Sequence, residues 1–443
     1  MARFARIGGE DATKTASEAR RSFFYGYAVV FGSWLAMFVS AGAQYSFAIF
    51  QPTLLNEFGW TRGMISLGPT LNMFTMLLFA LAGGYLVDRI GPRWTVIIGA
   101  VIGGIGVAAL SMVTQVWHFI VLYGVLAPLG ISLCYWIAPV STVRRWFMRR
   151  AALMVAITMS GSGLGIVLLV PAAHSMIEAW GFRAGYLVFG AILVVGAVLG
   201  GLLLKKDPES AGTHPDGIEP REEELKARAD FVTRAQHWSL REAMRTSSWW
   251  LLIGAHLGHS LALMGLLNHL IIWGTVDIGI PTGTMVMIYS YVFVLSAVVA
   301  RLLGGFTSDW YMSRFRASRK PIMYLNILGV GLGVFLCPLV GSSLSMALVV
   351  LLLGFSYGLG LAIFPTYIGD LFGVGNLPVL FAILGLFVDG FAATGPVFYG
   401  FTYDATGSFN LAFIITGVLC IISAVCLFFI KAPKKREPQH SAS

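Results

Sequence analysis

Long apolar segments separated by short polar loops make up most of this chain. A helix of about 20 apolar residues crosses the roughly 30 Å hydrocarbon core of a bilayer, because each residue adds about 1.5 Å. Six such segments occupy the first half of the chain, and six more occupy the second. We therefore expect an all-α membrane protein with twelve spanning helices, at residues 25–50, 66–87, 95–115, 119–143, 152–174, 185–204, 249–274, 284–304, 322–342, 344–366, 378–400 and 410–430.

A polar stretch separates the two sets of six segments. It carries several prolines and glycines and the acidic run Glu222-Glu223-Glu224, and it cannot bury enough apolar surface to form a core. Near its end, Ser239 followed by Glu242 predicts the capped start of a short helix. The expected organisation is a tail at 1–22, a six-helix bundle at 23–204, a cytoplasmic linker at 205–247, a second six-helix bundle at 248–430 and a tail at 431–443.

The composition excludes a water-soluble fold. Of the 443 residues, 57% are hydrophobic and 12% are charged, and the mean hydropathy is +0.78, so the apolar surface must face lipid. The four cysteines lie in apolar segments without paired spacing, and we interpret them as small buried hydrophobic residues. The first 22 residues are polar, and no small-residue cleavage site follows the first span. No removable signal peptide is therefore expected.

The positions of lysine and arginine predict the orientation. Placing both termini in the cytoplasm puts 27 of the 30 basic residues on that side, with Arg62 and Arg183 on the other and Arg301 inside a span. This bias decides the topology under the positive-inside rule. It also accounts for the net charge of +9, because these residues face an anionic leaflet, and no basic stripe supports a nucleic-acid partner. We expect a multi-pass protein of the cell (plasma or inner) membrane.

A short motif occurs twice, each time where the second span of one half ends. Residues 84–93 read GYLVDRIGPR, and residues 305–310 read GFTSDW. A repeat of this period is typical of transporters built from duplicated bundles. The glycine that begins the motif permits close approach of neighbouring helices. The aspartate at the helix end lies near arginines and can form a charge network at the cytoplasmic end of the bundle, which breaks when the transporter changes conformation. The alternative is an ordinary charged loop. The predicted gating residues are Gly84, Asp88, Arg89, Gly91, Arg93, Gly305 and Asp309.

The first copy resembles the loop signature Gly-x-Leu-x-Asp-Arg-x-Gly-x-Arg of the major facilitator superfamily. The chain departs from that pattern at Pro92, where the family often has a basic residue, and in the second copy, which lacks an Arg after Asp309. The resemblance implies two six-helix bundles related by a pseudo-twofold axis along the membrane normal. It also implies transport by alternating access between them.

Further stretches resemble monocarboxylate transporters and the related oxalate:formate antiporters. They include Arg145-Trp146-Phe147, residues 160–165 (SGSGLG), Gly181-Phe182-Arg183 and, closer to the antiporter branch, residues 42–47 and 58–62. The likeness runs through nearly all of the chain. Gly161, Gly163 and Gly165 lie within an apolar helix, so we interpret them as a packing face and not as a nucleotide loop.

Two charged residues stand out inside predicted spans, Arg301 and Asp389. A charge at the centre of a membrane helix costs on the order of 3 kcal/mol or more unless it faces a cavity or a partner. A guanidinium can grip a carboxylate through two parallel hydrogen bonds, which suggests an organic anion as substrate. The resemblance agrees, because monocarboxylate and oxalate carriers place a substrate-binding Arg in this helix just before the loop motif. The alternative is a structural ion pair with Asp389 or with a backbone carbonyl.

The chain lacks other charged residues of these families. It has Ala297 where monocarboxylate transporters carry an Asp, Tyr45 where they carry a Lys, and Asp389 around where the oxalate antiporter has a second cation. Two-point capture of a dicarboxylate is therefore not expected. As a hypothesis, Asp389 balances Arg301 in the empty site and takes up a proton when the substrate displaces it, which would couple anion and proton entry. The alternative for Asp389 is a fixed structural charge.

Other polar residues at mid-depth are candidates to line the cavity. For each of them, an inter-helix hydrogen bond or aromatic packing is an equal alternative to substrate contact. His256 and His259 have metal-ligand spacing, but no third ligand lies nearby in that helix, and no metal is expected. The predicted substrate-binding residues are Arg301, Tyr45, Gln44, Tyr135, His259 and Tyr357, with Asp389 in proton coupling.

These observations predict a secondary transporter that moves a small organic anion, a monocarboxylate, with proton coupling. Three alternatives stay open: an anion exchanger of the oxalate/formate type without protons, an exporter of an amphipathic compound, and a membrane sensor that binds a metabolite without moving it. No nucleophile with a base, metal cluster or paired carboxylates occurs in the spans, so no enzyme is expected. The expected partners are the anion, protons and lipid, with no cofactor and no obligate protein partner.

Overall fold

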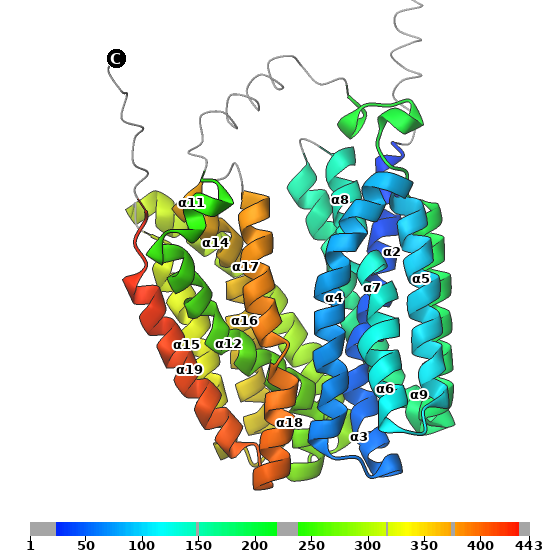
Figure 1. The fold of residues 1–443 in the computed structure, drawn as a ribbon, viewed down its shortest axis with the longest axis vertical. Coiled ribbons are helices and arrows are strands. Elements are labelled where there is room, and N and C mark those ends of the chain that lie inside the picture. The colour runs from blue at the N-terminus through cyan, green and yellow to red at the C-terminus, as the bar shows by residue number, and fades with distance from the viewer. Residues whose placement is uncertain (1–23, 148–149, 219–237, 316–317, 374–376, 434–443) are drawn as a thin grey trace, which may run out of the picture.

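The computed structural model describes residues 24–147, 150–218, 238–315, 318–373 and 377–433 of the chain (Figure 1). Every regular element in these ranges is helical. The helices of the first half are α2 (Gly26–Tyr45), α3 (Phe47–Phe58), α4 (Arg62–Ile90), α5 (Pro92–Ala109), α6 (Val116–Val121), α7 (Ala127–Tyr135), α8 (Ile137–Trp146) and α9 (Ala151–Leu202).

The second half repeats this all-helical plan. A one-turn helix, α11 (Leu240–Met244), precedes it. The helices that follow are α12 (Ser247–Ile272), α13 (Thr282–Met287), α14 (Val294–Phe315), α15 (Lys320–Leu336), α16 (Ser343–Phe372), α17 (Leu377–Ala392), α18 (Gly395–Thr406) and α19 (Asn410–Phe429).

Eleven continuous helical stretches of the described residues are long and apolar enough to cross a membrane. The number is one fewer than the twelve predicted spans, because one stretch, Leu153–Leu202, contains both the fifth and the sixth. Gly181 interrupts that stretch with φ 78° and ψ 165°, a conformation that only glycine adopts readily. Each of the twelve predicted segments therefore coincides with helix, and the all-α membrane fold is confirmed.

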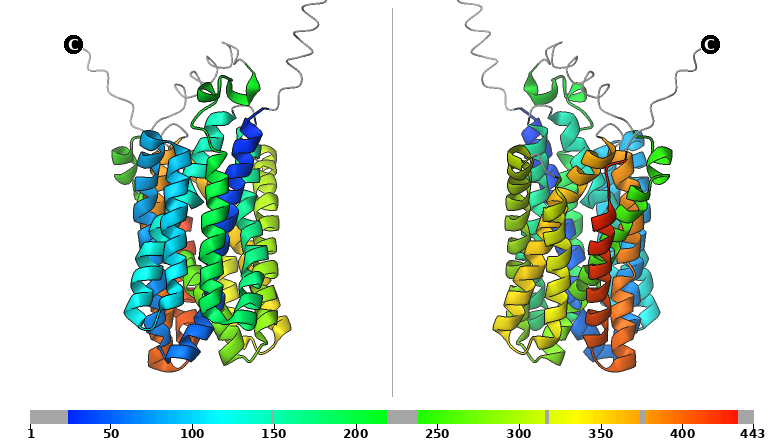
Figure 2. Two further views of the ribbon diagram at one scale, coloured as in Figure 1. Left: turned by 90° about the vertical axis from the view of Figure 1, so that its right-hand side faces the viewer. Right: turned by 90° about the vertical axis from the view of Figure 1, so that its left-hand side faces the viewer.

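The helices form two bundles that stand side by side (Figures 1 and 2). One buried apolar cluster draws only on residues up to Leu204, and another draws only on residues from Trp238 onward. A third cluster joins the bundles, because Ala48, Ile49 and Val170 of the first pack with side chains of the second. The two-bundle layout is confirmed.

Helix α2 begins and α19 ends at the same end of the molecule, where residues 205–218 also lie (Figure 1). We call this the linker end, and the opposite end the distal end. The described part of the linker folds onto the first bundle, since the Trp146 indole donates to the Lys205 carbonyl and the Lys205 ammonium lies 4.3 Å from the Tyr25 ring centre. The predicted cap is confirmed, because the Ser239 and Glu242 side chains each bond the other's backbone N–H.

The glycine-rich segment of α9 packs closely against α2. A Cβ on Gly161 would lie 2.5 Å from the Trp34 carbonyl oxygen, and one on Gly165 would clash with the Phe38 carbonyl oxygen. Gly163 points elsewhere, toward Val294 of the second bundle at 4.0 Å. The predicted packing face therefore consists of Gly161 and Gly165, which are four residues apart and lie on one side of the helix.

This contrast gives a stability prediction. Alanine raises helix propensity by about 1 kcal/mol over glycine in either position, so the difference between two variants isolates the close approach. We expect Gly161→Ala to be less stable than Gly163→Ala by about 1 to 3 kcal/mol, because its methyl group meets backbone that cannot move aside. Thermal unfolding of the two detergent-purified variants checks this. Equal unfolding temperatures would contradict it.

Candidate functional site

Several spans are interrupted near mid-depth, and Tyr45, Tyr135 and Asp389 of the predicted site residues lie at or near the interruptions. The first span breaks after Tyr45, where the Ser46 hydroxyl donates to the Gly42 carbonyl at 2.6 Å. The fourth breaks after Tyr135, at Trp136 with φ −123° and ψ −61°. The eleventh breaks four residues after Asp389, between α17 and α18. Interrupted helices with free backbone groups form the binding sites of many transporters.

A π-helical turn in the fourth span, Leu122–Leu126, is held by side chains of α4. The wider turn releases carbonyls from the helix pattern, and Asn72 donates to the Tyr123 carbonyl at 2.9 Å while Thr75 donates to that of Gly124 at 2.7 Å. A similar turn, Ile288–Phe293, contains Tyr289. These turns bring Tyr123 and Tyr289 within electrostatic range of each other and of Tyr45.

The structure connects four other predicted residues to Arg301, directly or through Tyr45 and Tyr357. The Tyr45 hydroxyl interacts with Tyr135 and lies within electrostatic range of Arg301. Tyr357, on α16, lies within range of Tyr45, Arg301 and Asp389. Tyr45 and Tyr135 come from the first bundle and the other three from the second, so this cluster lies between the bundles. We call these five residues the central site.

Arg301 and Asp389 have no partner among the described residues. The Arg301 side chain is half-buried, and its Nε is buried without a hydrogen-bond acceptor. The Asp389 side chain is exposed, and no ion pair joins it to Arg301 or to any other described residue. An unpaired charge at this depth of a membrane protein is tolerable where it faces an aqueous cavity. The alternative of a structural Arg301–Asp389 pair does not occur in this structure.

Two other candidates lie apart from this cluster. The Gln44 amide donates to Asn72 at 2.6 Å within the first bundle, although its Oε1 is buried without a partner. His259 is buried in the second bundle, with its ring centre 5.1 Å from that of His256. No contact among the described residues joins either of them to Arg301, and their roles in substrate binding stay predictions. The described residues contain no cluster of three metal ligands.

The first copy of the loop motif forms a charge cluster at the linker end. The Asp88 carboxylate pairs with Arg145 at the end of α8, at 2.5 Å, whereas Arg89 donates to the Tyr85 hydroxyl. Gly91 ends α4 with φ 85°. The sequence interpretation expected Arg89 and Arg93 beside Asp88, but a cation from another helix takes that place. A Cβ on Gly84 would lie 3.9 Å from Ile137, so this glycine makes no close approach here.

The second bundle has a comparable cluster at the same end. The Arg319 guanidinium pairs with Asp370 at 2.5 Å and donates to the Ser308 hydroxyl at 2.9 Å. Gly305 and Asp309, the motif residues predicted there, lie on α14, but their surroundings are outside what the structure describes. Each of these clusters joins helices within one bundle.

At the distal end, an ion pair and several hydrogen bonds join the two bundles. Arg62, the first residue of α4, makes two hydrogen bonds with the Asp277 carboxylate, at 2.6 and 2.8 Å. The guanidinium lies 3.6 Å from the Tyr403 ring centre, and the Tyr403 hydroxyl donates to Asp277 at 2.8 Å. The Arg62 side chain is only 8% exposed and that of Asp277 21% exposed, so solvent screens this pair weakly.

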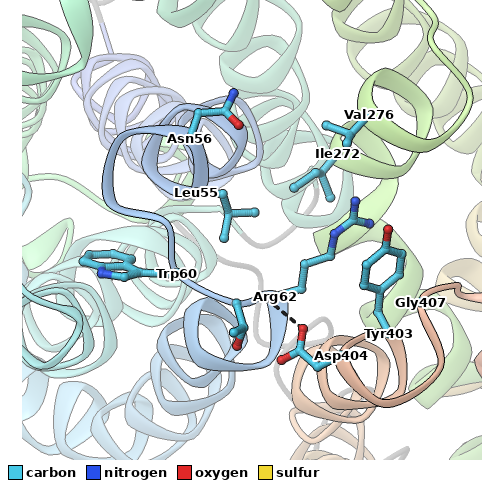
Figure 3. Close-up of a pocket in the computed structure, with 10 residues that line it drawn as sticks. Leu55, Asn56, Trp60, Arg62, Ile272, Val276, Tyr403, Asp404 and Gly407 are labelled. Carbon is cyan, nitrogen blue, oxygen red and sulfur yellow. Dashed lines mark hydrogen bonds between the residues drawn. The ribbon is translucent and has the colours of Figure 1, made fainter.

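Asp404 strengthens the same junction through the backbone. Its carboxylate accepts from the backbone N–H groups of Arg62 and Gly63, at 3.1 and 2.8 Å (Figure 3). These groups have no partner within α4, because they belong to its first turn. A carboxylate at a helix N-terminus is also favoured by the helix dipole. We call Arg62, Asp277, Tyr403 and Asp404 the distal latch; a cavity of about 400 Å³ adjoins it.

A buried histidine extends this junction toward the membrane centre. His269 Nε2 lies 3.1 Å from both the Ser66 hydroxyl and the Pro396 carbonyl, and Nδ1 lies 3.5 Å from the Gln51 amide. Ser66 and Gln51 belong to the first bundle. Every hydrogen bond and ion pair that joins the bundles within the described ranges therefore lies on the distal side of the central site.

The sequence interpretation missed the residues of this junction. Arg62 entered it as one of two basic residues on the non-cytoplasmic side and as the end of the stretch 58–62, without a partner. Asp277, Asp404 and His269 were not considered. A usable signal was present, since Asp277 and Asp404 follow predicted spans on the side that carries Arg62. Nothing in the sequence pairs them, because the partners are 215 and 342 residues apart. Tyr123 and Tyr289 were missed for a different reason, because π-helical turns leave no clear sequence pattern.

These features define a class of membrane protein: two helical bundles with a polar site between them and polar contacts that join them on one side of it. The model of the Major Facilitator Superfamily matches residues 33–318 and 311–443. The chain belongs to the Major Facilitator Superfamily.

Two similar proteins and one similar solved structure show what this chain resembles. The chain is 23% identical to monocarboxylate transporter 12 of Rattus norvegicus over 431 residues, covering 93% of this chain and 86% of the relative. It is 24% identical to the oxalate:formate antiporter of Oxalobacter formigenes over 401 residues, covering 89% of each. A solved bacterial homologue of the human lysosomal transporter Spinster, in an inward-facing and unoccupied conformation, has the same fold. Its TM-score is 0.74 at 14% identity, over 92% of this chain and 97% of that one.

The latch gives a conformational prediction. Removing one partner of a partly buried ion pair costs about 1 to 3 kcal/mol, between the limits for exposed and buried pairs. We expect Arg62→Gln to loosen the distal junction and to raise the labelling rate of a cysteine introduced as Ala48→Cys, which is 6% exposed between the bundles. Impermeant maleimide applied from the distal side measures the rate.

The double variant tests whether the pair acts as a unit. Asp277→Asn should have the same effect as Arg62→Gln, and combining the two should add little, because either change alone breaks the pair. Glu57→Gln, an exposed distal carboxylate outside the latch, serves as the control. Unchanged labelling in both single variants would contradict the assignment.

Proposed function

We propose that this protein carries a small organic anion with one carboxylate across the membrane by alternating access. The observation that carries the proposal is the half-buried guanidinium of Arg301, which has no partner among the described residues and lies in a tyrosine-rich site between the bundles. A planar guanidinium group binds a carboxylate through two parallel, charge-assisted hydrogen bonds. The similarity to monocarboxylate and oxalate:formate carriers supports an organic anion as the substrate.

The linker end faces the cytoplasm of a plasma or inner membrane in this proposal, with both termini on that side. The excess of basic residues in the linker-end loops supports this orientation. Bundles 23–204 and 248–430 rock about the central site, and the distal latch closes the outer side. The state described here is then open toward the cytoplasm. The Asp88–Arg145 and Arg319–Asp370 clusters brace the ends of each bundle, and the loop motifs gate the inner side.

Asp389 couples transport to protons in the same proposal. A carboxylate that is unpaired beside an anion site raises the cost of bringing in a second negative charge, and a proton removes that cost. Anion and proton then travel together, and binding of either favours binding of the other. The absence of a described partner for Asp389 supports a titrating role over that of a fixed structural charge.

Anion exchange without protons is the second candidate, and the similarity to the oxalate:formate antiporter favours it. Counterflow in vesicles at matched pH separates exchange from proton symport. The chain offers only one cation among the described residues of the central site, which argues against two-point capture of oxalate. An exporter of an amphipathic compound would be favoured if Arg301→Ala spared transport, and a sensor would bind its metabolite without moving it.

Arg301 provides the direct test of the carboxylate site. Arg301→Lys keeps the positive charge and removes the planar fork, so we expect at least about a tenfold loss of uptake for every carboxylate that wild-type protein transports. Uptake into proteoliposomes of lactate, pyruvate, formate and acetate measures this. Arg241→Gln, on the exposed face of α11, is the control and should retain full uptake. Undiminished uptake in Arg301→Lys would refute the assignment.

Asp389 provides the test of coupling. If its carboxylate carries the proton, wild-type uptake of an acid rises as the external pH falls, because the protonated form is the one that admits the anion. Asp389→Asn is permanently neutral, and its uptake should no longer depend on pH. Initial rates across a pH series measure this, with Glu57→Gln as the matched carboxylate control. Full retention of the pH dependence in Asp389→Asn would exclude the coupling role.

A further inference from the structure

The Asp389 carboxylate is unfavourable in a carrier of anions, because its negative charge repels an anionic substrate. Among the described residues, Arg301 and Asp389 are the charged groups that act on the Tyr357 hydroxyl. They are opposite in sign and lie in the same bundle, and neither pairs with another described residue. When the site is empty, the charges of Arg301 and Asp389 sum to zero. A purely anionic ligand neutralises Arg301 but leaves Asp389 without a positive partner.

The surroundings of these charges also suit a positive group. Tyr45 and Tyr135 of the first bundle and Tyr357 of the second surround the site, and the Phe293 ring stacks with that of Tyr357 at 5.9 Å. The faces of aromatic rings attract ammonium groups, by about 0.5 to 2 kcal/mol depending on desolvation. Tyr45 places an aromatic ring where monocarboxylate transporters carry a lysine, so no second ammonium competes for this space.

We propose that the central site also accepts acids that carry a positively charged amine. The carboxylate binds the Arg301 guanidinium, and the ammonium group faces Asp389 and the tyrosine rings. This inference rests on the proposed function and names a substrate class for it. A plain acid satisfies Asp389 by arriving with a proton, whereas an amino acid brings its own positive charge. Coupling therefore depends on the substrate, and amino-bearing acids move without a proton.

Matched pairs of ligands test the inference with purified full-length protein. Butanoate, pentanoate and hexanoate are compared with 4-aminobutanoate, 5-aminopentanoate and 6-aminohexanoate, because the chain length sets how far the ammonium lies from the carboxylate. Thermal stabilisation reports binding, and uptake into proteoliposomes at about pH 5.5 and about pH 7.5 reports coupling. At least one amino acid should bind, and its uptake should be equal at the two pH values, whereas uptake of its plain counterpart should be greater at the lower pH.

Variants of Arg301 and Asp389 distinguish a failure of this inference from a failure of the proposed function. Asp389→Asn should weaken binding of the amino acid about 10- to 100-fold, the usual effect of losing a hydrogen bond to a charged group, and should leave the plain acid bound. Asp389→Glu should keep amino-acid binding, which shows that the site is folded. Arg301→Lys should weaken both ligands.

Each other outcome overturns a defined claim. If plain acids bind in an Arg301-dependent manner and no amino acid does, this inference fails and the proposed function stands. Amino-acid binding that is equal in wild type and Asp389→Asn also overturns the inference, as does uptake of the amino acid that depends on pH like that of the plain acid. If neither class of ligand binds, or if Arg301→Lys changes nothing, the proposed function itself fails.

Discussion

The ion pair between Arg62 and Asp277 is the contact on which the arrangement of the two bundles depends most. It joins residues 215 positions apart, and with Asp404 and His269 it supplies the polar contacts between the bundles that the described residues show. All of them lie on the distal side of the central site, so the polar contacts that join the bundles within the described residues are confined to that side. These charged and polar groups act together with the apolar cluster that Ala48, Ile49 and Val170 form with the second bundle.

The central site follows from a related constraint. A charge inside a membrane must find either a partner or water, and Arg301 and Asp389 have no partner among the described residues. The surrounding helices are interrupted at the same depth, after Tyr45 and after Tyr135, and a π-helical turn carries Tyr289. Interruptions of this kind cost backbone hydrogen bonds, and side chains such as Asn72 and Thr75 compensate for the loss. The polar groups between the bundles therefore rest on local distortions of helices that are otherwise regular.

The fold was largely predictable from the sequence, because length and apolarity alone mark helices that cross a bilayer. Even the merged stretch Leu153–Leu202 was predicted as two spans, since the segment around Gly181 is less apolar. The central site was predictable in part. Arg301 and Asp389 are conspicuous as charges within spans, and the predicted tyrosines Tyr45, Tyr135 and Tyr357 interact with one another or with these charges in the structure. Whether a polar residue at that depth faces the cavity depends on helix rotation, which explains why Gln44 bonds within its own bundle instead.

The contacts of the distal latch and the partner of Asp88 could not be predicted from the sequence, for another reason. Both depend on which helix ends lie side by side. The hydrophobic pattern predicts the length of a span, but not its position along the membrane normal relative to a helix that is distant in the sequence. A shift of one residue moves a helix end by about 1.5 Å, which is enough to break a hydrogen bond of 2.6 Å. Pairings such as Asp88 with Arg145 become visible only when the bundle has been assembled.

Asp404 contacts main-chain donors instead of a side chain, and this has a consequence for how the sequence can diverge. Any amino acid other than proline presents the same N–H at position 62, so that hydrogen bond survives a change of the Arg62 side chain. Position 63 has to remain glycine, because a Cβ there would lie 2.5 Å from the Asp404 carboxylate. Homologues that replace Arg62 therefore lose the ion pair with Asp277 but keep this anchor at the distal end, provided that Gly63 and an acceptor at the end of α18 persist.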